Sequence, residues 1–191
     1  MANGLKIPIR VLCARRMLKF NVKFDDKEMF NEIVKQRATL KVGFFPDQVY
    51  EAIDKPFYAN VAKPNTKGTW NEKVGKPRRY SARKQIPVAQ VAMIQEYGEP
   101  SHHIPPRPFM KWTVYKNARK WRNFVQDVLP QTMNAKDTME RLGQRVVRDM
   151  KEMITDWSEP PNAPSTIAQK GFNNPLIDSG QMRDSVRMEV V

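Results

Sequence analysis

The chain has 191 residues, 40% of them hydrophobic, and carries 33 Lys and Arg against 20 Asp and Glu, a formal net charge of +13. This length fits one domain with a sizeable core, and the hydrophobic content argues against global disorder. The charge predicts either a polyanionic partner such as DNA or a place in an acidic protein assembly, and charge alone does not separate the two.

The sequence excludes a disulfide framework and a cysteine metal cluster, because Cys13 is the only cysteine. Lys6, Pro8 and Arg10 interrupt the apolar residues of the N-terminus, which therefore lacks the apolar core of a signal peptide. Runs of about 18 apolar residues, as a membrane-spanning helix needs, are absent from the sequence. We expect a soluble protein with no membrane partner, made in a reducing cytoplasm.

The first part of the chain has the pattern of a strand, a helix and a second strand. Apolar and polar residues alternate over 17–24, which predicts a half-buried strand. Residues 27–36 place apolar side chains on one helical face, and the aspartates at 25–26 are suited to cap that helix. Residues 39–45 read as the second strand. We interpret residues 1–16 as an N-terminal extension.

Residues 55–85 form a basic excursion, which we interpret as a loop or a β-hairpin with 57–62 as one arm. Two readings stay open. The excursion is a solvated loop that tolerates insertion, or it is a basic arm that contacts DNA or a neighbouring subunit. The residues that would make such a contact are Lys67, Lys73, Lys76, Arg78, Arg79, Arg83 and Lys84.

Two long amphipathic helices are expected in the second half of the chain. Apolar residues recur at steps of three and four over 111–129, and Pro130 is expected to end this first helix. Asn134 then has the position of an N-cap, with Asp137 at the third residue of a second helix over 135–157. Two neighbouring amphipathic helices predict an antiparallel pair packed on a sheet.

The C-terminal region, 158–191, begins as a polar, turn-rich segment. Asp178 or Ser179 is expected to cap a single helical turn, and alternation over 186–190 predicts a terminal strand. Together the elements predict one α+β domain over 1–191. We expect a small mixed or antiparallel sheet packed against the two long helices, with the basic loop or hairpin as an excursion.

A proline-rich elbow, 95–112, joins the predicted sheet to the helix pair, and 88–97 before it fits a short helix or a strand. Three prolines surround Arg107, and proline fixes φ near −65° and restricts the residue before it. We expect Phe109 to plug the core at this joint. Arg107 either pairs bidentately with Glu96, reaches the next subunit, or is one of two independent surface charges.

The sequence offers no convincing catalytic or metal-binding pattern. His102 and His103 are adjacent without an HExxH or CxxC pattern, which favours a surface turn. Ser179 lacks a nucleophile-elbow sequence and is better explained as a cap. The carboxylates within 149–156 interleave with basic residues, as on a salt-bridged helix surface. We therefore expect no enzymatic activity, no metal and no cofactor.

Two motifs in this sequence resemble one protein family. The first is Glu96-Tyr97-Gly98 followed by Ile104-Pro105-Pro106-Arg107-Pro108-Phe109-Met110. The second is Ala163-Pro164-Ser165-Thr166-Ile167, then Lys170-Gly171, then Asn174-Pro175-Leu176-Ile177-Asp178-Ser179-Gly180. In residues and order they resemble the tail-completion, or neck, proteins of tailed bacteriophages, over residues 39–191. Asn174 departs from that pattern, which commonly has a lysine there.

The resemblance implies a structural virion protein without enzymatic activity. Such proteins form a ring, commonly sixfold, at the head–tail junction around the DNA channel, and such rings close through heterologous contacts. Implied partners are copies of the same chain, a head–tail adaptor, and a tail terminator or tube, with non-specific contact to genomic DNA. Implied structural or interface residues are Glu96, Tyr97, Gly98, Arg107, Pro108 and Phe109 in the elbow, and Pro175, Leu176, Asp178, Ser179 and Gly180 in the C-terminal motif.

The residues themselves leave a second function open. A free DNA-binding protein would use the basic arm 67–84 to contact phosphates, and its affinity for duplex DNA would fall steeply with salt.

Overall fold

The computed structural model describes residues 5–13, 16–24, 27–50 and 86–191. The expected hairpin arm, the basic residues from Lys67 to Lys84 and the expected helix cap at 25–26 lie outside the described residues. The described residues on either side of the excursion lie side by side. Tyr50 N donates to Ile86 O at 3.0 Å, and Val88 N donates to Gln48 O at 2.9 Å.

A mixed four-stranded sheet in the order β2-β1-β3-β4 forms one layer of the fold. The strands are β1 (Leu5–Cys13), β2 (Arg16–Phe24), β3 (Leu40–Gly43) and β4 (Arg187–Val190). β1 and β2 form an antiparallel hairpin, β3 runs parallel to β1, and β4 is antiparallel to β3. The chain's last strand therefore completes the sheet beside a strand from its first quarter, which confirms the expected terminal strand.

Strand β1 occupies residues that were expected to form an N-terminal extension. Its register pairs Leu5 with Phe24 and Cys13 with Arg16. The sequence LKIPIRVLC does alternate apolar residues with Lys6, Pro8 and Arg10, which is a strand signal. Pro8 hides that signal, because proline cannot donate to a ladder and normally argues against a strand.

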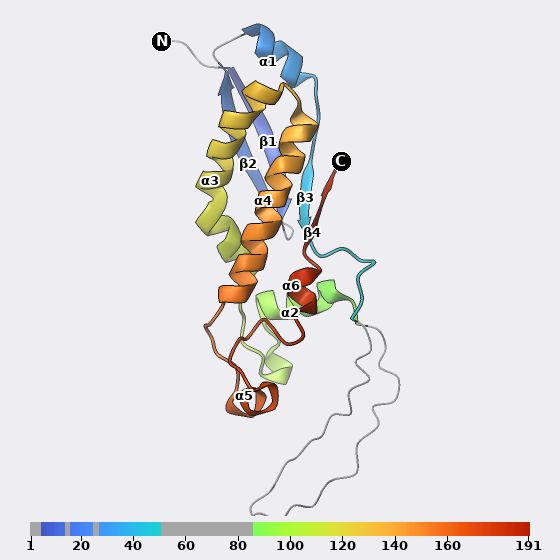
Figure 1. Cartoon of the computed structure of the whole chain (residues 1–191), viewed down its shortest axis with the longest axis vertical. Helices are drawn as coiled ribbons and strands as arrows, with labels where there is room; N and C mark the ends of the chain where they lie inside the picture. The colour runs from blue at the N-terminus through green and yellow to red at the C-terminus, as the bar shows by residue number, and fades with distance from the viewer. Residues whose placement is uncertain (1–4, 14–15, 25–26, 51–85) are drawn as a thin grey trace, which may run out of the picture.

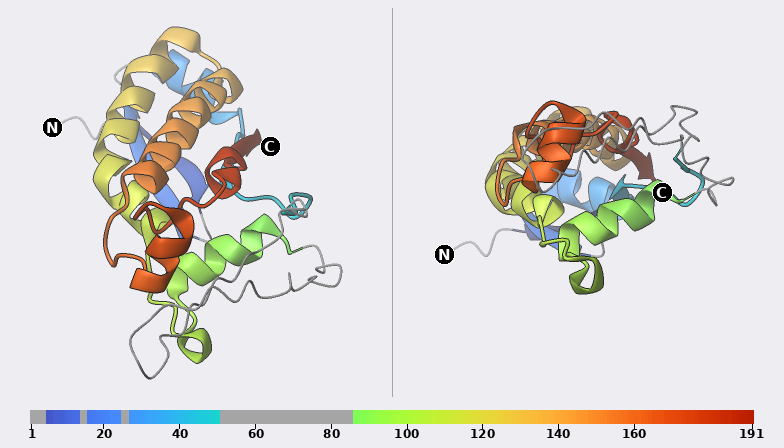
Figure 2. Two further views of the ribbon diagram at one scale, coloured as in Figure 1. Left: turned by 60° about the horizontal axis from the view of Figure 1, so that its bottom comes forward. Right: turned by 90° about the horizontal axis from the view of Figure 1, so that it is seen from below.

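Six α-helices lie within the described residues: α1 (Lys27–Val34), α2 (Val88–Tyr97), α3 (Phe109–Thr132), α4 (Ala135–Asp156), α5 (Pro164–Lys170) and α6 (Gln181–Asp184). α3 and α4 run antiparallel along one face of the sheet (Figure 1), α3 against β2 and α4 against β3 and β4. α2, α5 and α6 gather at one end of this layer, around the elbow (Figure 2). The α+β fold with two long helices packed on a sheet is thus confirmed.

The core lies between the helix pair and the sheet. Trp121 and Leu129 of α3, Leu142 and Val146 of α4, and Leu40 of β3 are each at most 1% exposed. Burying side chains of this size stabilises the fold by about 1.5–3 kcal/mol each. The periodicity that predicted the two helices is therefore the pattern of their buried faces.

The ends of the helix pair show one correct prediction and one wrong one. Asn134 Oδ1 accepts from Asp137 N at 3.1 Å, which confirms the N-cap of α4. Pro130 does not end α3, which continues to Thr132 and stops at Met133 with φ 51°. A proline in the last turn removes only one helical donor, and Met133 N still donates to Leu129 O at 3.0 Å.

Two shorter segments form helices that the sequence had left open or had not indicated. Residues 88–97, which fitted either a helix or a strand, form helix α2. The turn-rich segment after residue 158 contains α5, which begins at Pro164 and ends at Gly171 with φ 79°. Proline at the first helical position and glycine after the last are the usual signals for such a helix.

Gly143 lets α4 approach the sheet closely. A Cβ built at this position would lie 2.1 Å from Met188 Sδ and 2.8 Å from Leu40 Cδ1. Both atoms belong to flexible side chains of the sheet, so a small substituent needs only local repacking, whereas a branched one displaces the helix.

We therefore expect Gly143→Val to destabilise the protein by about 1–3 kcal/mol, because the added methyl groups overpack the contact between helix and sheet. The matched control is Gln144→Val, which places the same side chain at the next, exposed position of α4. Urea unfolding of both variants measures the difference. Valine has a higher helix propensity than glycine, so propensity alone would not destabilise Gly143→Val. A Gly143→Val variant that is no less stable than Gln144→Val would contradict overpacking.

Candidate functional site

Gly98 sets the geometry of the elbow that follows α2. It has φ 77°, and its N donates to Ile94 O at 2.8 Å, which closes the helix. A Cβ at Gly98 would lie 2.9 Å from both Ile104 O and Pro106 N. These are backbone atoms that have no freedom to move aside, so both the left-handed conformation and the close approach require glycine.

His102 and His103 lie exposed in the turn at the tip of the elbow, as expected. A 3-10 turn, Pro100–His102, precedes His103, which has φ 56°. Glu99 and Ile104 bridge the base of the turn through two backbone hydrogen bonds, of 2.9 and 3.0 Å.

Glu96 caps helix α3 from another part of the chain. Its side chain is buried, with Oε2 accepting from Met110 N at 2.8 Å and Oε1 accepting from Lys111 N at 3.1 Å. Pro108, the residue before α3, provides no side-chain cap. A carboxylate at a helix N-terminus receives free N–H donors and meets the positive end of the helix dipole. Glu96 therefore fixes the direction in which α3 leaves the elbow.

Arg107 joins the elbow to the C-terminal region and is only 5% exposed. Its Nη1 donates to Gln95 Oε1 at 2.8 Å, its Nε to Pro160 O at 3.1 Å, and its Nη2 to Pro161 O at 3.3 Å. Its backbone N donates to Gln95 O at 2.6 Å. Burial lowers the pKa of Arg107, and the three acceptors compensate for the lost hydration of the guanidinium.

The expected bidentate pair between Glu96 and Arg107 is therefore wrong, and the reach of Arg107 to a next subunit stays a prediction. The carboxylate is engaged by the amides of α3, which lack a cap of their own. The guanidinium instead finds backbone carbonyls of a segment about fifty residues further along the chain. Both groups are buried, so they are not independent surface charges.

Phe109 plugs the core, as expected. It is 0% exposed and meets Phe44 edge to face, with ring centroids 6.2 Å apart. Tyr97 behaves in the opposite way, because 62% of it is exposed at the end of α2. Phe109 therefore serves packing, and Tyr97 is available for contact.

Asn174 organises the C-terminal motif in a way that the sequence reading missed. Its Oδ1 accepts from the backbone N of Leu176 at 3.1 Å and of Ile177 at 3.0 Å, and its Nδ2 donates to Thr155 O at 2.6 Å. The backbone O of Asn174 accepts from Lys170 Nζ at 2.7 Å. The sequence did contain a signal for this role, since the side chain of an asparagine at a turn commonly accepts from the backbone two residues further along.

The remaining motif residues divide between packing and surface. Pro175 and Leu176 are buried, and so is Gly180, which has φ 84°. Ser179 Oγ accepts from Gln181 N at 3.3 Å, but the residue at the N-cap of α6 is Gly180, which has no side chain to cap the helix, so neither Asp178 nor Ser179 takes the expected cap position. Asp178 is exposed.

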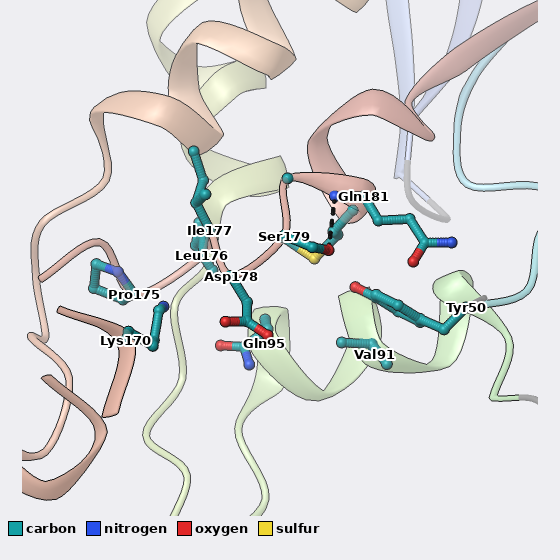
Figure 3. A pocket seen from close by; sticks show the side chains of 12 residues that line it. Tyr50, Val91, Gln95, Lys170, Pro175, Leu176, Ile177, Asp178, Ser179 and Gln181 are labelled. Atoms are coloured by element: carbon teal, nitrogen blue, oxygen red, sulfur yellow. Dashed lines mark hydrogen bonds between the residues drawn. The ribbon is translucent and has the colours of Figure 1, made fainter. Parts of the chain in front are cut away.

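A small cavity of about 90 Å³ separates α2 from the C-terminal motif (Figure 3). Tyr50, Gln95, Lys170 and Asp178 contribute polar groups to its lining. Burial, and next to it the charge of Asp178, raises the pKa of Tyr50 to about 12. Burial is also the main cause that lowers the pKa of Lys170. Small-molecule sites usually measure about 300–1,000 Å³, so we regard the joint between the segments, rather than this cavity, as the candidate site.

The structure also locates the salt-bridged surface expected on α4. Arg148 lies 3.9 Å from Asp149 and 3.8 Å from Glu152, and Asp149 also accepts from Trp121 Nε1 at 2.7 Å.

Within the described ranges, no group of three or more His, Cys, Asp or Glu side chains could hold a metal ion. Among the described helices, none combines the length and apolar character that crossing a membrane requires.

No family model, curated protein or solved structure matches this chain. The resemblance to bacteriophage neck proteins therefore stays a prediction that rests on the two motifs.

We expect Glu96→Gln to destabilise the protein by about 2 kcal/mol, because the amide replaces a charged acceptor of two backbone donors with a single neutral one. Glu152→Gln, the same change at an exposed position of α4, is the control. Thermal unfolding compares the two variants. If Glu96→Gln melts like the control, the carboxylate does not stabilise the start of α3.

Arg107→Ala should cost about 3 kcal/mol or more, because it leaves Gln95 Oε1 and two proline carbonyls without their buried donor. Arg119→Ala removes the same side chain from an exposed position and should cost little. Urea unfolding of the monomer measures both. An Arg107→Ala monomer of undiminished stability that no longer self-associates would instead make Arg107 a subunit contact.

Proposed function

We propose that the protein is a structural component of a phage neck, assembling as a ring, commonly sixfold in the family it resembles, at the head–tail junction around the DNA channel. Its partners would be copies of itself and the adjoining head–tail adaptor and tail terminator or tube. It would be made in the host cytoplasm, act in the virion and act by assembly, without turnover.

The observation that carries this proposal is that its two motifs meet in space. Arg107, from the first motif, donates to Pro160 and Pro161, at the entrance to the second. Gln95 and Leu176, from opposite sides of the joint, line the same small cavity. Two motifs that resemble one family, in the expected order, would be expected to form one structural unit, and the contacts fit that expectation.

An exposed apolar surface on the same end of the molecule supports self-association. Met93 and Tyr97, four residues apart on α2, are 41% and 62% exposed, and Ile86 just before the helix is 41% exposed. Residues four apart lie on one face of a helix. Exposed apolar side chains that gather at one place are typical of contact surfaces, and a contact between unlike surfaces closes into a ring when the rotation allows.

Native mass spectrometry and negative-stain imaging test this proposal. We expect a discrete ring, formed by the protein alone or with other neck proteins, and we expect Met93→Ala combined with Tyr97→Ala to weaken it without lowering monomer stability. Tyr115→Ala, which removes an even more exposed ring from α3, is the control. A monomer under all these conditions, with neck proteins present, would contradict the proposal.

The alternative is a free DNA-binding protein that uses the arm 67–84, which lies outside the described residues. Neutralising Arg78, Arg79, Arg83 and Lys84 should then abolish most of the affinity for duplex DNA. Unchanged affinity in that variant would end this alternative.

A further inference from the structure

Helix α3 has a basic and aromatic outer face that none of the contacts behind the neck proposal involves. Its inner face buries Val114, Trp121 and Val125. Between Lys111 and Asn123 the outer face exposes eight side chains, Lys111, Trp112, Tyr115, Lys116, Arg119, Lys120, Arg122 and Asn123. Five of the eight are cationic, residues 100–126 contain no Asp or Glu, and the one acidic residue of α3, Asp127, is exposed beyond them toward the end of the helix. The two faces of one helix thus differ completely in chemistry.

The cations of α3 are arranged differently from those of the neighbouring helix. On α4, Arg141 pairs with Asp137 and Arg148 lies beside Asp149 and Glu152. On α3, no ion pair joins Lys111, Lys116, Arg119 or Lys120 to any residue in the described part of the chain. The charge on α4 is locally balanced, whereas the charge of these four α3 residues is left to an external anion.

The exposed aromatic side chains lie within this basic stripe. Trp112 and Tyr115 are 48% and 77% exposed and meet edge to face, with ring centroids 5.4 Å apart. At one residue per 1.5 Å of helix, the cations from Lys111 to Arg122 span about 16 Å. The indole N–H and the phenol O–H add neutral donors to the same surface, and tyrosine hydroxyls are among the groups that bond phosphate oxygens.

We propose that this face of α3 binds the phosphate backbone of duplex DNA without reading its sequence. Duplex DNA carries one negative charge per about 1.7 Å of its axis, so phosphates are available along the whole length of this stripe of cations. The face belongs to an α-helix, and the major groove of duplex DNA, about 12 Å wide, admits an α-helix, whereas proteins hold single strands in positively charged grooves.

An acidic protein surface is the other macromolecule that such a charge could attract. Three of the five cations are lysines, at 111, 116 and 120. Lysine is depleted in protein–protein interfaces, whereas it is a general partner for phosphates. The composition therefore favours DNA over an acidic protein.

The test compares two variants that lose the same number of charges. The first variant removes three charges from α3 through Lys116→Gln, Arg119→Gln and Lys120→Gln. The second removes three charges through Arg141→Gln, Arg148→Gln and Arg183→Gln, and each of these arginines lies beside a carboxylate in the structure. Binding of a fluorescent duplex of mixed sequence is followed by anisotropy over a series of salt concentrations, and circular dichroism checks that both variants fold.

We expect the α3 variant to bind at least tenfold more weakly at moderate salt. Its slope of log affinity against log salt should fall by about 2.7, since each lost phosphate contact removes about 0.9. The paired-arginine variant should retain the affinity and slope of the unaltered chain. Unchanged binding by the α3 variant, or an equal loss in both variants, would overturn the proposal.

Poly-L-glutamate supplies the second arm of the test. If it displaces the duplex at equal charge concentration, and does so through the same three cations, the face recognises acidic polypeptide and the assignment to DNA is wrong. The inference stands apart from the neck proposal, because the α3 variant should still assemble as a ring. Loss of DNA binding with intact assembly, and loss of assembly with intact DNA binding, are separate outcomes.

Discussion

The buried guanidinium of Arg107 is the constraint on which the arrangement of the joint depends. A buried cation without hydrogen-bond acceptors costs several kcal/mol, so the carboxamide of Gln95 and the carbonyls of Pro160 and Pro161 must be held in place around it. These acceptors come from α2 and from the segment that follows α4. One side chain therefore holds the elbow after α2 against the segment that follows α4, at one end of the helix layer.

The neighbouring carboxylate of Glu96 carries out a separate task, because it receives the first amides of α3. The joint thus contains one buried anion and one buried cation that each have their own partners. Gly98 makes this possible, since only a residue without Cβ fits between the carbonyl of Ile104 and the ring nitrogen of Pro106. The direction of α3 follows from these contacts, and with it the outward orientation of its basic face.

Local periodicity made the larger elements predictable. The buried faces of α3 and α4 repeat at helical spacing, and the cap at Asn134 depends on residues within one turn. The partners of Arg107 were not predictable in this way, because they are backbone carbonyls, which no side-chain pattern marks. Strand β1 was missed because Pro8 lacks the N–H donor of a sheet ladder and so argues against a strand, and Pro130 was given too much weight because a proline in a last turn removes a single donor.

Hydrogen–deuterium exchange of the unaltered protein and of Arg107→Gln tests the central claim, that Arg107 holds the elbow and the C-terminal motif together as one unit. We expect amides in 95–111 and in 174–182 to lose protection together in the variant, because Arg107 bonds to Pro160 and Pro161, and the next residue, Asn162, donates its Nδ2 to Asn174 O. The middle of α4, 139–150, should keep its protection. Unchanged exchange in 174–182 while 95–111 opens would contradict the account, since the two segments would then be held independently.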